Sequence, residues 1–68
     1  MKISARNQLS GTVVAVHKGA TTSHVVIAVG DAQIFASITN EAVAELGLEK
    51  GKKATAVIKA SDVMVAVD

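Results

Sequence analysis

The amino-acid sequence predicts an all-β domain, an OB-fold-like five-stranded barrel with one short helix between the third and fourth strands. Runs rich in Val, Ile and Thr recur along the 68 residues, and short turns that contain Gly or other small residues separate them. This pattern is typical of strands. One segment, residues 39–48, has the capping residues of a helix instead. Three strands, a helix and two further strands form the layout of an OB-type barrel.

The first three strands are expected at Leu9–Val16, Ser23–Val29 and Gln33–Thr39. β-Branched residues are frequent in these runs, and they favour the pleated backbone of a strand. The small-residue turn 19–23 joins the first two strands. The tight turn at Gly30-Asp31 makes the second and third strands a hairpin.

The helix is expected to begin at Thr39 or Asn40, because both residue types cap helix N-termini well. Val43 and Leu46 lie three residues apart, so they are expected to face the barrel together. Gly47 is expected to end the helix as its C′ residue.

The last two strands are expected at Lys53–Lys59 and Val63–Val67, joined by the short turn 60–62. The run Val63–Val67 is apolar at every position, as is Val25–Ile27. The outer face of an isolated barrel should be polar. Strands that are apolar on both faces therefore predict that another subunit covers them.

Length and composition point to a single domain, residues 1–68, that needs support from outside its own core. A domain of this size buries only about 60% of the surface of its unfolded chain. The usual supports are disulfides, a structural metal or oligomerisation. The chain has no Cys, and two His residues without Cys do not have the spacing of a zinc-binding motif. A homo-oligomer is therefore expected.

The same composition argues against several classes of protein. The formal net charge is only +1 and Phe35 is the single aromatic residue, whereas nucleic-acid binders carry basic stripes and single-strand binders add aromatic stacking platforms. No arrangement of nucleophile, base and acid stands out, so no enzyme activity is expected. The sequence shows no apolar leader and no run of about 20 apolar residues. A cytoplasmic protein that does not bind membranes is expected.

Two short motifs near the ends of the chain suggest a small oxyanion as ligand. Each places one cation beside hydroxyl or amide side chains: Ser4-Ala5-Arg6-Asn7 and Lys59-Ala60-Ser61. Arg and Lys supply charge and N–H donors, Ser supplies a hydroxyl, and Ala leaves the backbone amides accessible.

These motifs, together with others between them, closely resemble the molbindins, the small molybdenum-pterin-binding (Mop) proteins. The matching segments are Ser4–Gly11, Ile38-Thr39, Glu45–Leu48, Gly51-Lys52 and Ile58–Val63. The resemblance covers essentially the whole chain. It implies a hexamer, built as a trimer of dimers, that binds molybdate or tungstate between subunits for intracellular molybdenum storage and homeostasis, without catalysis.

The resemblance also implies which residues bind the ion. One class of site would combine the first motif of one chain with Thr39 and the second motif of its neighbour. The candidate oxyanion-binding residues are Ser4, Ala5, Arg6, Asn7, Thr39, Lys59, Ala60 and Ser61. A second class lies near the threefold axis, and the resemblance does not identify its ligands. Three copies of the turn after the first strand would form a positive pocket on the axis, so its candidates are His17, Lys18, Gly19 and Ala20. Ala42 stands where some relatives carry a Ser, which removes one hydroxyl donor.

Two alternative functions stay open at this point. One is an OB-fold nucleic-acid-binding protein, which the single aromatic residue disfavours. The other is an interaction module that senses the oxyanion and docks on another protein, which differs from a storage protein only in having that partner.

Overall fold

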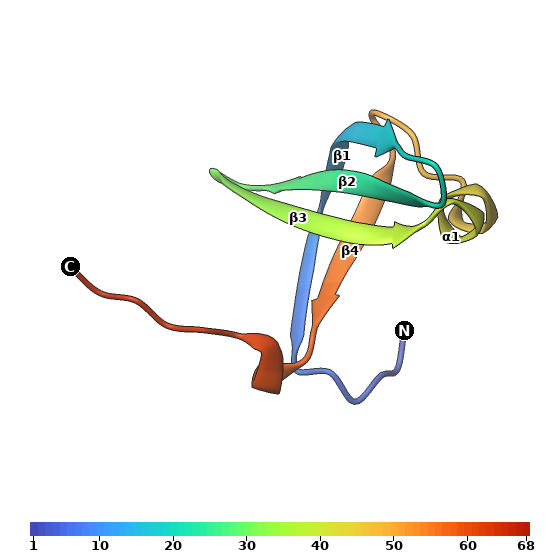
Figure 1. Ribbon diagram of the computed structural model, residues 1–68. Coiled ribbons are helices and arrows are strands. Elements are labelled where there is room, and N and C mark those ends of the chain that lie inside the picture. Colours follow the sequence, from blue (N-terminus) through green and yellow to red (C-terminus); the bar gives the residue numbers. More distant parts are fainter.

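The computed structural model describes all residues 1–68 and shows one curled antiparallel sheet with a short helix at its edge (Figure 1). The elements in chain order are β1 (Asn7–Lys18), β2 (Thr22–Val29), β3 (Ala32–Thr39), α1 (Asn40–Leu46), β4 (Lys53–Ile58) and the 3₁₀ helix η1 (Ala60–Asp62). The strand order is β3-β2-β1-β4. The all-β class and the single helix between the third and fourth strands are confirmed.

The fifth strand predicted at Val63–Val67 is wrong for the single chain. After β4, η1 redirects the backbone, and residues 63–68 run away from the sheet as an extended tail (Figure 1). Met64, Val65 and Val67 are each about nine-tenths exposed, at 94%, 88% and 91%. A strand exists only when a neighbouring strand accepts its hydrogen bonds. The tail lies beside no strand of its own chain.

Strand β1 is longer than expected because it pairs with different strands along its two halves. Residues 7–12 pair with β4, and residues 12–18 pair with β2. A bulge between Val13 and Ala15 shifts the register, and bulges bend a strand. Gly11 lies so close to β2 that a Cβ there would be 2.2 Å from the Ala28 carbonyl oxygen. The bend and the missing side chain let the sheet curl.

The core is small and lies inside this curl. Val13, Val25, Ile27 and Ala56 pack against one another there. Only six of the 68 residues are buried, so apolar burial within one chain supplies limited stability.

A polar contact ties the turn between β1 and β2 to the start of the helix. Ser23 is buried, at 1% exposure, and its hydroxyl donates to the side-chain oxygen of Asn40. The Asn40 amide nitrogen donates in turn to the carbonyl oxygens of Gly19 and Ala20, at 3.0 and 3.4 Å. Because a buried hydroxyl needs a partner, this contact fixes the turn against the helix.

The prediction that Thr39 caps α1 is confirmed. Its side-chain oxygen accepts a hydrogen bond from the Ala42 backbone N–H at 3.1 Å. Asn40, the alternative cap, is instead the first residue of the helix.

The end of α1 confirms one expectation and corrects another. Gly47 has a φ of +62° and ends the helix as predicted. Val43 packs against the core, but Leu46, which was expected beside it, is 58% exposed. The helix is only seven residues long and lies at the edge of the sheet, so its last turn extends past the core.

Candidate functional site

The two terminal motifs lie next to each other because β1 and β4 are paired. Asn7, the first residue of β1, is opposite Ile58, the last residue of β4. Residues 4–6 and 59–61 therefore extend from neighbouring strand ends, at the lower end of the sheet in Figure 1. This juxtaposition brings one Arg and one Lys to the same end of the molecule.

The first motif is organised by Arg6 and Asn7. Arg6 Nε donates to the Ser4 carbonyl oxygen at 2.9 Å, and one terminal nitrogen donates to the Ile3 carbonyl oxygen at 3.2 Å. A guanidinium has five N–H donors, so three remain. Asn7 Nδ2 donates to the Ile58 carbonyl oxygen at 3.2 Å, and this bond ties the two strand ends together.

The second motif offers donors from three consecutive residues. Lys59 is exposed and directly precedes η1. Within η1, the backbone N–H groups of Asp62 and Val63 donate to the carbonyls of Lys59 and Ala60. The N–H groups of Ala60 and Ser61 have no such partner, and with the Ser61 hydroxyl and the Lys59 ammonium they form a donor-rich, exposed segment.

Thr39 lies elsewhere in the same chain. It pairs with Thr22 at the end of β3, beside the Lys18 end of β1, whereas the terminal motifs adjoin the Asn7 end. Its oxygen accepts the capping bond, which leaves the hydroxyl proton free to donate. A single chain therefore assembles the two terminal motifs but does not bring Thr39 to them.

The residues predicted for a threefold-axis site lie around the turn between β1 and β2. His17 and Lys18 end β1, and Gly19 and Ala20 form the turn; all four are exposed. The bonds from Asn40 hold this turn in place. No second copy is present, so this site stays a prediction.

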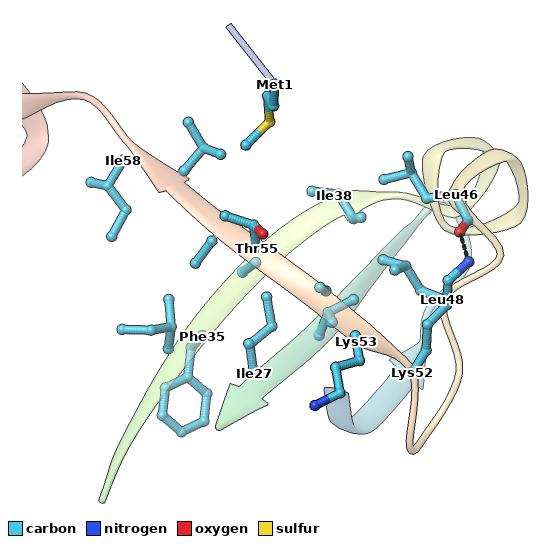
Figure 2. Close-up of a pocket in the computed structure, with 16 residues that line it drawn as sticks. Met1, Ile27, Phe35, Ile38, Leu46, Leu48, Lys52, Lys53, Thr55 and Ile58 are labelled. Atoms are coloured by element: carbon cyan, nitrogen blue, oxygen red, sulfur yellow. Dashed lines mark hydrogen bonds between the residues drawn. The ribbon is translucent and has the colours of Figure 1, made fainter. Parts of the chain in front are cut away.

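A groove that the sequence reasoning missed lies between β3 and β4. It has a volume of about 710 Å³, and 13 of its 16 lining residues are hydrophobic. Figure 2 shows Ile27, Phe35 and Ile38 on one side of it and Ile58 on the crossing strand β4. Such a lining suits apolar side chains and not an oxyanion. None of residues 63–68 lines the groove.

Neither a metal cluster nor a membrane-spanning helix is found in the fold. No group of three or more His, Cys, Asp or Glu side chains comes together. None of the chain's helices has the length and apolar character that crossing a bilayer requires.

Comparison with known proteins gives a family match over most of the chain. Residues 3–65 match the TOBE domain. A Haemophilus influenzae protein named as a probable molybdenum-pterin-binding protein is 49% identical, and the match covers 100% of both chains.

Solved structures agree with this match. The molybdate-binding protein from Sporomusa ovata has a TM-score of 0.93 and 39% identity, over 98% of this chain and 100% of that one. The cytoplasmic molybdate-binding protein ModG, in a crystal form with molybdate bound, has a TM-score of 0.89 and 48% identity, over 94% of this chain and 46% of that one.

Proposed function

The chain belongs to the TOBE-domain family, and from that premise we propose that it binds molybdate or tungstate without catalysis, as an intracellular store of the ion. The observation that carries the proposal is the pairing of Asn7 with Ile58, which brings two cation-bearing motifs to one end of the sheet. Relatives named for molybdate binding, one of them cytoplasmic, support both the ligand and the location.

The chemistry of the motifs matches the ion. Molybdate is a dianion with four oxygens, and removing it from water is favourable only if many fixed donors replace its hydration shell. Hydrogen bonds between charged partners are about twice as strong as neutral ones. Arg6 and Lys59 offset the charge, while the hydroxyls of Ser4 and Ser61 and the free backbone N–H groups orient the oxygens.

We place each pocket between two copies of the chain. Arg6 bonds back to its own segment, and in Figure 1 the N-terminal segment and η1 leave the strand ends on opposite sides. Both motifs are therefore open to solvent in a single copy. In the assembly, the first motif of one copy faces the second motif of another, and the two together enclose the ion. Thr39, at the other end of β1, joins the pocket from a neighbouring copy.

The surface of the chain supports the homo-oligomer. Its accessible surface is 5341 Å², whereas a compact monomer of 6.9 kDa exposes about 4,000 Å². The radius of gyration is 12.6 Å, compared with about 11 Å for a compact domain of this length. Both differences support the proposal that a part of this surface is buried in an assembly.

The tail and the groove are complementary parts of that assembly. Residues 63–67 form an exposed apolar segment, and the groove between β3 and β4 is an apolar channel between two sheet edges. We propose that the tail of one copy fills the groove of another and completes its barrel as a fifth strand. The resemblance to molbindins extends this exchange to a hexamer, a trimer of dimers.

Calorimetry with the ligand-free protein tests the proposed function. Molybdate and tungstate should each bind at a defined stoichiometry and raise the melting temperature, because a ligand that binds only the folded state stabilises it. Sulfate at the same concentration should have a clearly smaller effect. Equal responses to the three anions would indicate nonspecific anion binding and contradict the storage function.

A further inference from the structure

His17 and His24 form a pair across two neighbouring strands. The register of β1 and β2 places them directly opposite each other, and Ser37 on β3 is the next residue in the same row. Directly opposed residues lie on the same face of a sheet, with Cβ atoms about 4.5–5.5 Å apart. The two imidazoles are therefore neighbours, although they lie seven positions apart in the sequence.

The pair faces away from the core. Val25, the neighbour of His24 in β2, is 1% exposed and belongs to the core cluster. Side chains alternate between the faces of a strand, so His24 and its partner His17 lie on the outer face. Both are exposed.

The ring nitrogens are free to bind a ligand. Neither imidazole takes part in a side-chain hydrogen bond within the chain. Beside the pair lies a shallow hollow of about 170 Å³, lined by His24, Phe35, Ala36 and Ser37. This hollow leaves space for water next to His24. It shares Phe35 and Ala36 with the groove that we assign to the tail, whereas His24 and Ser37 line the hollow alone.

We propose that His17 and His24 bind a divalent transition-metal ion, such as Ni²⁺, Cu²⁺ or Zn²⁺, on the outer face of the sheet. Imidazole is a ligand that these metals prefer, at metal–nitrogen distances of about 2.0–2.1 Å. No third protein ligand is close, so water fills the other coordination positions. The ion links β1 to β2 next to the turn at residues 19–21. This proposal is independent of the oxyanion pocket at the terminal motifs, although His17 is also a candidate for the threefold-axis site.

Titration of the tag-free protein with Ni²⁺ tests the pair. Once one imidazole has bound the ion, the second binds at high effective concentration, so wild type should bind more tightly than His17→Ala or His24→Ala by on the order of 10²-fold. The two single variants should lose affinity equally. Lys50→Ala, which changes an exposed charge in a turn outside the candidate sites, should bind as wild type does. Ni²⁺ should also raise the melting temperature of wild type and not of the single variants.

A rescue variant gives the sharpest outcome. Ser37 is opposite His24, so Ser37→His in the His17→Ala background creates a new cross-strand pair and should restore Ni²⁺ affinity. The proposal is wrong if wild type binds Ni²⁺ no more tightly than the double variant His17→Ala/His24→Ala. It is also wrong if only one His matters, or if the rescue variant folds and stays at the single-variant affinity.

Discussion

The two ends of the long strand β1 differ in how many of the nearby polar and apolar groups find partners within the same chain. At the Lys18 end, Ser23, Asn40 and the turn at 19–21 are joined by hydrogen bonds, and the helix is capped. At the Asn7 end, Arg6 and Lys59 are exposed, and the tail beyond Val63 is exposed and pairs with no strand. We therefore expect the Lys18 end to contribute most to the stability of a single chain, and we propose that the Asn7 end contributes most to assembly and to the pocket formed by the terminal motifs. Changes at the two ends should have separable effects.

The largest effect on the fold is expected where the sheet curls. Gly11→Ala places a methyl group 2.2 Å from the Ala28 carbonyl oxygen, and backbone cannot move aside as a flexible side chain does. The sheet must open, so we expect a loss of about 3 kcal/mol or more, the upper part of the range for overpacking. Circular dichroism and thermal melts would show it. Gly30→Ala is a matched control, because its strain is limited to a positive φ of 57° in an open turn. A Gly11→Ala protein with wild-type stability would contradict the close approach of β1 and β2.

Removal of the tail is expected to have a second large effect, on the oligomeric state and not on the structure of the single chain. Removal of residues 63–68 leaves β1–β4 and their hydrogen bonds in place but removes the segment proposed to fill the groove. Sedimentation equilibrium should show a loss of the wild-type oligomer. The control removes Asp68 alone and should assemble normally. An unchanged mass after removal of 63–68 would show that the tail is not the assembly element.

Substitutions of Thr39 are expected to have a smaller effect, and they can separate its role as helix cap from its proposed contact with molybdate. Thr39→Ala removes the bond to the Ala42 N–H and should cost about 1 kcal/mol of stability. Thr39→Asp keeps a good capping acceptor, so stability should stay close to wild type, but its negative charge should weaken molybdate binding. Thr39→Ser should keep both properties. Unimpaired molybdate binding in Thr39→Asp would exclude Thr39 from the pocket.

Structural features that depend on residues close together in the sequence were predicted well. Features that depend on contacts between distant residues were not. The turn at Gly30, the cap at Thr39 and the C′ position of Gly47 each follow from residues a few positions apart. The tail was predicted as a strand because its residues favour strands, but residue preferences do not specify which sheet edge accepts it. Ser23 and Asn40 are 17 positions apart, and no sequence pattern predicts their contact.

The candidate site was predictable to a similar extent. The two terminal motifs could be recognised from residue type and from their resemblance to molbindins. Their juxtaposition required the register that pairs Asn7 with Ile58. The apolar groove was missed because the sequence predicted a fifth strand in the chain's own barrel, whereas residues 63–68 run away from the sheet.

We propose that Arg6 of one copy and Lys59 of another bind the same oxyanion. Molybdate calorimetry on Arg6→Ala, on Lys59→Ala and on a refolded mixture of the two tests this most directly. Each variant should lose about 2–4 kcal/mol of binding free energy per site, roughly 30- to 1,000-fold in affinity. Lys50→Ala, an exposed charge in a turn, is the control and should bind normally. In mixed oligomers some pockets regain both cations, so part of the sites should bind with near-native affinity. If mixed oligomers form and no tight sites return, the pocket is not shared between copies.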